Sequence, residues 1–577
     1  MSKNQPLDKL FIIIGLTGIF ILPQLNNVHY DPQPQFWAEI TACWFMIGLF
    51  CLTIFNSDRI YIPSIIIPTS IFAVYLVFQP VIVHTDFPGL NYVTALEMLI
   101  CIMFAISINT IKQKFGITYL VTILSYILLT GAILQTLIGF IQYSGNYNHF
   151  GDLIFYDSDH PTTNIFGHFG QRNHYAHYLT WGTFAAIYLF QQRKISNNIF
   201  YLVLTWLSFS ITIAASRSVL IYFPAAILIC GLYAAIKRDK NSRRLLITMI
   251  IATIAVFLME YFYPLIHHLL SAQNNISSGL ERISADSGTG RRGVEWAKAW
   301  LVFKENPIFG YGWNEYAKQS VLLQHLFPKA PPNSGLFTNC HNLVLQLLAE
   351  TGIIGTLTVI LGILVAIYRS LKNELTLEII IILCMLSTTL IHSMNEYPLW
   401  YMYFLAGFIL FLSLDKPIFC IKSNMLAGIS TIPLLFLVYI MINSSFIFDK
   451  LVNYYDTPDD QKAFIKNANY IQNLVDNNKM WSYFAIYTLD NYINVDTAFT
   501  NALYPTLTQL QYTNKFNSFH PYPDTLIKEA MLQWNMGYKD KARSLVETAV
   551  LAFPVYKSSF KDTLKAKKYK PLLELVK

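Results

Sequence analysis

Long apolar runs recur from the N-terminus to about residue 447, and they constrain the fold more than any other feature of the sequence. A run of roughly 17–25 residues can cross a hydrocarbon core of ~30 Å as a helix. These runs are continuous and do not alternate with polar residues, so they favour helices over the strands of a membrane barrel. Only 13% of the residues are charged, against roughly 25% in a soluble domain. The sequence therefore predicts an all-α polytopic membrane protein.

We expect about thirteen membrane-spanning helices, with boundaries that carry an error of a few residues. They are predicted at 9–23, 37–56, 60–80, 92–110, 117–142, 176–191, 198–214, 218–236, 245–265, 341–367, 376–392, 398–413 and 424–446. The first run follows Lys3 and Lys9 as in a signal peptide, but no cleavage site with small residues comes after it. We therefore interpret it as the first membrane helix.

Basic residues fall in alternate loops, and this pattern predicts the orientation. With the N-terminus in the cytoplasm, every cytoplasmic loop receives a Lys or Arg, as the positive-inside rule requires. These residues are Arg59, Lys112, Lys114, Arg193, Lys194, the stretch 237–244, Arg369, Lys372, Lys416 and Lys422. The net charge of +7 lies mostly in these loops, so it does not indicate binding to nucleic acid. The remaining loops are predicted to lie on the outer side.

The chain changes character near residue 448, where it becomes polar and aromatic. We expect a transmembrane domain over 1–447, including a large outer loop at 266–340, and an outer helical domain over 448–577. Within this domain, residues 521–554 predict two amphipathic helices joined by a turn at 537–540. Small residues and a closing proline fit one tetratricopeptide-like repeat: Ala530, Ala542, Ala549 and Pro554. A generic helical hairpin fits the same residues equally well.

The seven cysteines give no sign of a disulfide framework or of a metal site. Five of them fall inside apolar runs, and no C-x-x-C spacing occurs. The sequence therefore predicts no cysteine-based cofactor.

Polar residues cluster at the outer ends of the predicted helices, where ionisable groups are costly and often functional. One cluster, at 167–178, leads into the sixth helix and contains Gln171, Arg172, Asn173, His174 and His177. If that helix begins near Gln171, Asn173 and His177 share a face. Two histidines three residues apart could bind a metal, but no third ligand accompanies them. A polar helix cap is the alternative interpretation.

Arginines form the second and third clusters. Arg217 lies in a tight turn between two apolar spans, where it could extend to the interface or grip a phosphate in a bidentate fork. Arg291 and Arg292, with Arg282 upstream, precede an amphipathic stretch and a turn rich in Gly and Pro at 306–312. This pattern predicts an interfacial helix ended by a turn, although a solvated basic loop would have a similar composition.

The fourth cluster opens the tenth helix. Asn342, Gln346 and Glu350 recur at every fourth position and form one polar stripe. Glu350 would lie roughly 13 Å along this helix, where it could bond to a neighbouring helix. His341 stands at the helix mouth, and a histidine poised near neutral pH suits a general base; a helix cap is the alternative.

The fifth cluster is the turn at 392–401, which includes Glu396 and Tyr397 and could be a structural turn or a site wall. Each cluster alone is weak. Together they place several arginines, a histidine and amides on one face of one membrane. A site for a pyrophosphate attached to a lipid needs this combination.

These motifs resemble those of a known superfamily. The spacing of His341, Asn342, Gln346, Glu350 and Gly352 is similar to the signature of the O-antigen ligases and polymerases. The same holds for Ser216-Arg217 and for Arg292-x-x-x-Trp296 followed by the turn at 306–312.

Three further stretches, at 29–39, 170–176 and 392–400, resemble more particularly the bacterial O-oligosaccharyltransferases, the protein glycosylation ligases that modify pilins. The resemblance covers roughly residues 20–410 in register. The chain thus resembles this branch of the superfamily in particular.

The resemblance implies a helical membrane enzyme of the GT-C kind in the bacterial inner membrane, with its active site and C-terminal domain in the periplasm. The donor would be a glycan on undecaprenyl pyrophosphate. The acceptor would be a Ser or Thr hydroxyl of a periplasmic protein such as a pilin. The hydroxyl would attack the anomeric carbon without a metal or other cofactor. The implied partners are thus this lipid-linked oligosaccharide, the acceptor protein and membrane lipid, with no nucleic acid.

The resemblance also implies roles for single residues. His341 would be the base, and Arg217 and Arg292 would hold the pyrophosphate and stabilise charge on the leaving group. Gln171, Asn173 and His174 would line the site. The same matching assigns further substrate contacts to Arg172, Arg291, Asn342, Gln346, Glu396 and Tyr397. Arg291 stands beside Arg292, which leaves open which of the two contacts phosphate.

Other functions fit less of the sequence. An O-antigen ligase or polymerase would use the same chemistry on a lipid A core sugar or another glycan, and the extra helical domain favours a protein acceptor instead. A transporter would place charge near the midplane, often with internal repeats, and we see no such repeat. A structural scaffold would not need the Arg and His clusters.

Overall fold

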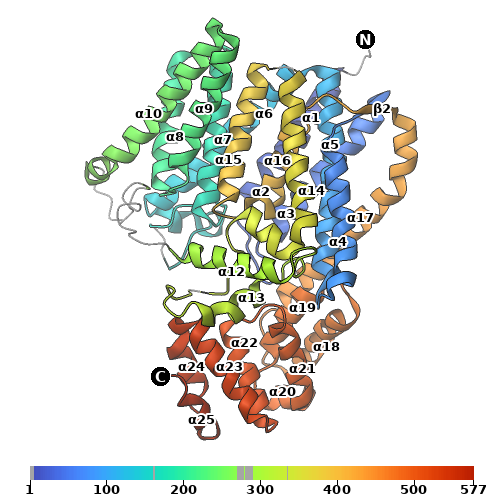
Figure 1. Ribbon diagram of the computed structural model, residues 1–577, viewed down its shortest axis with the longest axis vertical. Coiled ribbons are helices and arrows are strands. Elements are labelled where there is room, and N and C mark those ends of the chain that lie inside the picture. The colour runs from blue at the N-terminus through green and yellow to red at the C-terminus, as the bar shows by residue number, and fades with distance from the viewer. Residues whose placement is uncertain (1–4, 160–162, 270–278, 280–289, 334, 374) are drawn as a thin grey trace.

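The computed structural model describes residues 5–159, 163–269, 279, 290–333, 335–373 and 375–577. Long helices of the N-terminal part stand side by side along the long axis, and the C-terminal helices form a separate layer at one end (Figure 1). The helices of the first part are α1 Gln5–Phe20, α2 Leu22–Leu25, α3 Phe36–Phe55, α4 Ile66–Val83, α5 Pro88–Phe115, α6 Ile117–Tyr143, α7 Arg172–Gln191, α8 Asn197–Ile213, α9 Val219–Lys237, α10 Lys240–Leu269, α12 Arg291–Glu305, α13 Tyr316–Leu322, α14 Leu343–Asn373, α15 Leu377–Ser393, α16 Met402–Leu412 and α17 Ser423–Asn453.

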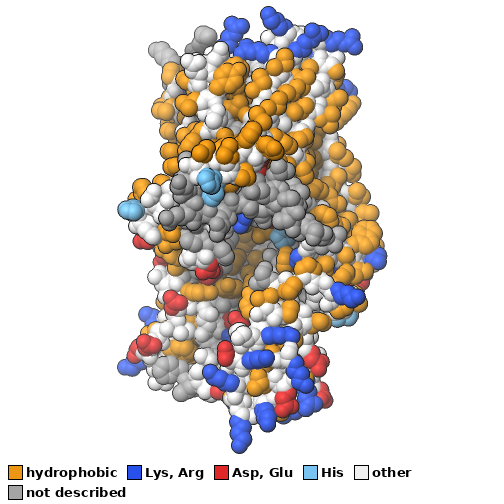
Figure 2. All heavy atoms as spheres, turned by 90° about the vertical axis from the view of Figure 1, so that its left-hand side faces the viewer, with side chains coloured by type: hydrophobic (Ala, Val, Ile, Leu, Met, Phe, Trp, Pro, Cys, Tyr) orange, Lys and Arg blue, Asp and Glu red, His pale blue; other side chains and the backbone are white. Residues whose placement is uncertain are grey.

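The prediction of a helical membrane protein is confirmed. Eight of the described helices (α3, α4, α5, α6, α9, α10, α14 and α17) are long and apolar enough to cross a membrane, and α8, α15 and α16 are shorter apolar helices. Apolar side chains cover the upper half of the face in Figure 2, and Lys and Arg gather at its upper edge. On α10 the exposed residues include Ile247, Ile254, Leu258 and Leu265. The number of thirteen crossings stays a prediction.

The helix predicted at 60–80 begins later than expected. Residues Arg59–Ile62 form strand β1, which pairs antiparallel with β2, Phe419–Lys422. Alternating β-branched and aromatic residues suit a strand, and Pro63 cannot donate a hydrogen bond to continue one. The short sheet brings Arg59 opposite Lys422. Both belong to loops that the sequence predicts on the same side of the membrane.

Helix α14 is broken near its outer end, where the sequence predicts one continuous span. Gly352 has φ 60°, a left-handed conformation that glycine adopts without strain. The backbone groups freed by the break bond to the turn at 306–312. Ile353 N donates to Pro307 O over 2.8 Å, and Gly312 N donates to Glu350 O over 3.0 Å. The Gly- and Pro-rich turn therefore completes the broken helix.

The turn approaches α14 so closely that only a glycine fits at 310. Gly310 has φ 69°, and a Cβ there would overlap the backbone of Glu350. Glu350 itself is fully buried, and its Oε1 accepts Gln346 Nε2 over 2.8 Å and Tyr316 N over 3.4 Å. This carboxylate ties α14 to α13, which confirms the alternative that it bonds to a neighbouring element.

Helix α7 lies at the centre of the membrane part. Every side chain over 174–189 is buried, and α7 packs between α6, α8 and α15. Its polar groups find partners on α15 and α1: Trp181 Nε1 donates to Met385 O over 3.0 Å, and Tyr178 Oη donates to Phe20 O over 2.5 Å. Because it is enclosed, the outer end of α7 is held firmly inside the bundle.

The C-terminal domain is entirely helical in its described elements. Its helices are α18 Gln461–Asn477, α19 Ser482–Leu489, α20 Ala498–Leu503, α21 Thr506–Asn517, α22 Pro523–Asn535, α23 Lys539–Ala552, α24 Lys557–Thr563 and α25 Lys570–Leu573. Short 3₁₀ helices of this domain lie at Asp490–Tyr492, Pro554–Tyr556 and Lys567–Tyr569, and those of the membrane part lie at Asn146–Leu153, Leu323–Leu326 and Pro398–Trp400. The predicted hairpin is confirmed as α22 and α23, with Ala530, Ala542 and Ala549 fully buried between them and their neighbours.

This domain rests on the loops at one end of the membrane part (Figure 1). His520 contacts Asn314 O through Nε2 at 3.3 Å, and Ser518 Oγ donates to Asp86. Val321 of α13 belongs to the same apolar core as α22 and α23. The domain is therefore built against the elements that carry the predicted site.

Candidate active site

Glu396 is the centre of the polar clusters that the sequence places on the outer side. It follows α15 in a turn, where its backbone N donates to His392 O over 2.8 Å. Its carboxylate is only 3% exposed. Asn173 Nδ2 donates to Oε1 over 2.9 Å, Gln171 Nε2 donates to Oε2 over 3.1 Å, and Arg292 forms an ion pair with Oε1. Side chains from two other clusters thus meet on this carboxylate.

The start of α7 supplies two of these contacts. Gln171 has an extended backbone and immediately precedes the helix, as the sequence predicts. Asn173, in the first turn, also accepts Ser216 Oγ through its Oδ1 over 2.8 Å. Ser216 is fully buried in the turn between α8 and α9, and Arg217 follows it with a half-buried side chain. We call Glu396 and the side chains that contact its carboxylate the Glu396 cluster. Asn173 therefore connects this cluster to the turn that carries Arg217.

His341 reaches the same carboxylate from the mouth of α14. Its Nε2 lies 3.5 Å from Glu396 Oε2. Its Nδ1 lies 2.9 Å from Asn339 O, and its backbone N donates to Asn339 Oδ1 over 2.7 Å. A carbonyl can only accept, so Nδ1 carries the proton and the neutral ring has its lone pair on Nε2. The predicted base thus directs its basic nitrogen at the cluster.

The surroundings of His341 keep the ring neutral near pH 7. Burial lowers its pKa below the usual value; Glu396 acts in the opposite direction and Arg292 in the same direction. The residue has φ 60°, which is rare for a side chain other than glycine and is often found at functional sites. A neutral imidazole in a fixed orientation is what a general base requires.

The two adjacent arginines of α12 have different partners. Arg291 donates to Glu295 Oε1 over 2.5 Å, to Gln324 Oε1 over 2.8 Å and to Pro331 O over 3.1 Å. Its guanidinium is thus directed away from Glu396, which Arg292 contacts instead. Arg292 is therefore the arginine of this pair that stands in the cluster.

A buried ion pair anchors the helix that carries Arg292. Lys298 Nζ lies 3.0 Å from Glu295 Oε1, and both side chains are 0% exposed. Glu295 Oε2 also accepts Tyr316 Oη over 2.7 Å and Ser320 Oγ over 2.6 Å. These bonds fix α12 on α13. Burial lowers the pKa of Lys298 to about 8, while the neighbouring Glu295 carboxylate opposes that shift.

Glu295→Ala is expected to destabilise the protein by about 3 kcal/mol, because removing one partner leaves a buried charge without compensation. Thermal unfolding of the purified protein in detergent measures this as a fall in the apparent transition temperature. Lys304→Ala, at an exposed position of the same helix, is the matched control and is expected to change little. An unchanged transition temperature for Glu295→Ala would show that the pair does not anchor α12.

The other predicted site residues support the cluster from outside it. Asn342 Oδ1 accepts Leu345 N over 3.1 Å, and its Nδ2 donates to Met394 O over 3.3 Å. Gln346 Oε1 accepts Cys340 N over 2.7 Å. These two amides hold the loop with His341. Tyr397 packs its ring 5.3 Å from the His341 ring.

Two further residues lie at the start of α7. Arg172 is half-buried in its first turn. His174 points inward, with its ring fully buried at 4.6 Å from Tyr401 and 5.2 Å from His392. His392 contacts His177 through the two Nδ1 atoms at 2.8 Å. In the described part of the chain no three His, Cys, Asp or Glu side chains form a group that could hold a metal. Arg282 lies outside the described residues.

Three family models match the chain in succession. A protein glycosylation ligase model matches residues 165–190, and an O-antigen ligase model matches 202–360. A model for the C-terminal part of a virulence factor membrane-bound polymerase matches 380–567. The matched stretches contain every residue of the Glu396 cluster.

Two curated proteins are also similar. A general O-oligosaccharyltransferase of Acinetobacter baylyi is 27% identical over 419 residues, which cover 69% of this chain and 69% of that protein. An uncharacterized protein of Haemophilus influenzae is 27% identical over 151 residues, which cover 25% of this chain and 37% of that protein.

Proposed function

We propose that this chain is an O-linked oligosaccharyltransferase of the bacterial inner membrane, because it matches models of the O-antigen ligases and of the protein glycosylation ligases and is similar to a general O-oligosaccharyltransferase. The donor is a glycan on undecaprenyl pyrophosphate, and the acceptor is a Ser or Thr hydroxyl of a periplasmic protein. The Lys- and Arg-rich edge in Figure 2 then faces the cytoplasm. The Glu396 cluster and the C-terminal domain lie at the opposite, periplasmic side.

One observation carries the proposal: His341 and Arg292 meet on Glu396, next to the turn that carries Arg217. In the reaction the acceptor oxygen attacks the anomeric carbon, and its proton passes to His341 Nε2. The bond between that carbon and the phosphate oxygen breaks, and undecaprenyl pyrophosphate leaves with the electron pair. Arg292 and Arg217 offset the negative charge that grows on the leaving group. Glu396 holds Arg292 in place.

No residue of this scheme needs a metal or another cofactor. Pyrophosphate is already a good leaving group, and guanidinium groups bind phosphate oxygens in a bidentate fork. Gln171 and Asn173, which fix Glu396, are placed to position the donor's head group. The lipid chain would lie among the apolar helices below.

The acceptor is assigned to a protein on two grounds. A protein glycosylation ligase model matches residues 165–190, and the C-terminal helical domain offers a surface of the kind that helical repeats use for binding. The second candidate is an O-antigen ligase or polymerase, because the models that match 202–360 and 380–567 are named for those activities. The two candidates share their chemistry and differ in the acceptor.

The test is glycan transfer in cells that supply an undecaprenyl-linked glycan and a candidate pilin. Mass spectrometry then searches for the glycan on Ser or Thr of the pilin. Transfer that depends on the intact chain would support the proposal. Sugar found on the lipid A core, or longer polymer chains with an unmodified pilin, would move the enzyme to the second candidate. No transfer to any of these acceptors would reject both.

Transfer is expected to fail at low pH, because a protonated His341 cannot accept the proton of the acceptor hydroxyl. Burial lowers the pKa of His341, so the acidic limb of the rate profile should lie below the usual histidine value of ~6.5. Glu396→Gln removes the carboxylate that favours the protonated ring, so it should move this limb to still lower pH. Initial rates from pH 5 to 8 measure both. A limb above the usual value, or no response to Glu396→Gln, contradicts the assignment.

A further inference from the structure

A polar cavity lies beside His341, and the mechanism above does not use it. Asn339 and Tyr397, which both contact His341, line this cavity, whereas Arg292 does not. The volume of the cavity is about 230 Å³, and its lining includes Gln33, Glu39, Glu97, Asn339 and Trp400. Asn339 is the residue whose carbonyl holds His341 Nδ1. This volume is below the ~300–1,000 Å³ of pockets for drug-sized ligands. The cavity therefore has room for a small unit next to the reacting centre.

Several polar groups that face the cavity have no partner in the described part of the chain. The side chains of Gln33, Glu97 and Asn314 make no hydrogen bond there. Glu39 Oε2 accepts Met402 N over 2.6 Å, but its Oε1 is shielded from solvent and unpaired. A buried polar atom is nearly always satisfied in a working protein, so a ligand could supply the partner that Glu39 Oε1 lacks. Gln33, Glu97 and Asn314 are half-buried, and their side chains are free to bond to the same ligand.

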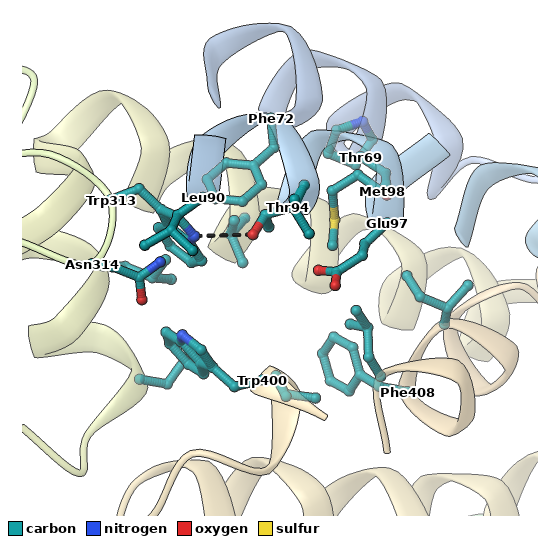
Figure 3. Close-up of a pocket in the computed structure, with 18 of the residues that line it drawn as sticks. Thr69, Phe72, Leu90, Thr94, Glu97, Met98, Trp313, Asn314, Trp400 and Phe408 are labelled. Atoms are coloured by element: carbon teal, nitrogen blue, oxygen red, sulfur yellow. Dashed lines mark hydrogen bonds between the residues drawn. The ribbon is translucent and has the colours of Figure 1, made fainter. Parts of the chain in front are cut away.

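The cavity combines these polar groups with aromatic walls. Trp400 stacks on Trp313 with ring centroids 5.6 Å apart and planes at 6°, and both line an adjoining apolar cavity of about 250 Å³. Figure 3 shows Trp400, Asn314 and Glu97 pointing into one space from three elements. The two cavities share Gln33, Glu97, Asn314 and Trp400. One ligand could thus meet an aromatic face and polar groups together.

The charged residues that line the cavity limit which ligands it can bind. Among the described lining residues there are two carboxylates and no Lys or Arg. A pyrophosphate would find no cation here to pair with, whereas Arg292 stands beside Glu396. Hydroxyl groups both donate and accept hydrogen bonds, so they can satisfy the carboxylates and the amides together. An apolar chain would leave all of these groups unpaired.

We propose that this cavity binds the sugar residue that is linked to the donor's pyrophosphate, and that it selects a neutral sugar. The inference rests on the proposed function for its donor. With the pyrophosphate on the arginine side and the sugar in the cavity, the anomeric carbon lies between them, beside His341. Glu39 and Glu97 accept hydrogen bonds from sugar hydroxyls, Asn314 and Gln33 bond to others, and Trp400 packs on the apolar face of the ring.

Photo-crosslinking of the full-length protein in membranes tests the cavity without turnover. The probe is a short-chain polyprenyl pyrophosphate that carries one neutral hexose with a diazirine on the sugar. We expect crosslinks in the peptides that contain Glu97 and Trp400. Glu97→Gln and Asn314→Ala should each reduce this labelling roughly tenfold, the effect of losing one hydrogen bond to a charged or buried partner. Glu378→Gln, a carboxylate at the other end of the bundle, should leave it unchanged.

Charge selection gives a second readout. A probe with a uronic acid in place of the hexose should label the wild-type protein weakly, because the described lining holds no Lys or Arg to pair with its charge. Sugar crosslinks elsewhere would overturn the inference, and so would labelling of this cavity by an acceptor peptide or by an isoprenoid diazirine instead. If the sugar labels the cavity but no glycan reaches any acceptor in cells, the proposed function fails and the sugar site stands.

Discussion

His341→Ala is expected to lower the rate of glycan transfer by roughly 10³, the range in which loss of a general base falls. The ring is the imidazole whose basic nitrogen faces the cluster, with Nε2 at 3.5 Å from Glu396. Without it the acceptor hydroxyl must lose its proton to water. The loss should appear in kcat and little in the KM for the donor, because the arginines that bind the pyrophosphate remain.

The measurement is transfer from a saturating undecaprenyl-linked donor to an acceptor peptide, by purified protein in detergent or nanodiscs. His341→Gln keeps polar bulk at the mouth of α14 and lacks a basic nitrogen, so it should be as slow as the alanine variant. Tyr311→Phe removes a hydroxyl that bonds to Glu305, outside the cluster, and should keep the wild-type rate. Full activity of a folded His341→Gln protein would remove His341 from the role of base.

The helices could be predicted because each depends on neighbouring residues. The start of α7 at Arg172 and the turn between α22 and α23 follow from local patterns. The meeting of the polar clusters at one site could also be predicted, because the topology expected from the basic loops puts all of them on one side of the membrane. The sequence did not show that Glu396 is the residue on which they meet, since its turn looked equally like a structural loop.

The errors come from contacts between distant parts of the chain. Residues 60–62 are apolar enough for a membrane helix, yet they pair with a strand near residue 420. The break in α14 at Gly352 is stabilised by the turn at 306–312, and no pattern within the helix announces that partner. In the sequence Glu295 and Lys298 look like an ordinary pair on one helix face. Their burial depends on Tyr316 and Ser320 of another helix, which bond to Glu295.

The sugar cavity was missed for a different reason. Glu97 lies inside the run predicted as a span at 92–110, and an ionisable residue in such a run is a functional signal in itself. Glu97 could therefore have been proposed from the sequence as a functional residue. That Glu97 shares a cavity with Asn314 and Trp400 could not be predicted, because these residues lie on other elements.

Arg292→Ala is expected to slow transfer by roughly 10²–10³, the usual effect of removing one preorganised group that stabilises developing negative charge. Arg292 is the guanidinium that α12 delivers to the cluster, while Arg291 is engaged by Glu295 and Gln324. Arg291→Ala should therefore act mainly on stability. Arg292→Lys should recover only part of the rate, because an ammonium cannot form the bidentate fork.

Arg292→Ala also leaves Glu396 buried without its cation, so a structural effect must be separated from a chemical one. Glu396→Gln in the same chain removes the uncompensated charge and keeps an oxygen for Asn173, although its amide NH2 group then faces the Gln171 donor. The double variant should regain most of the transition temperature that Arg292→Ala loses but remain slow in transfer. If the double variant transfers glycan at the wild-type rate, Arg292 serves only to neutralise Glu396. If it stays slow while fully folded, the guanidinium acts on the leaving pyrophosphate itself.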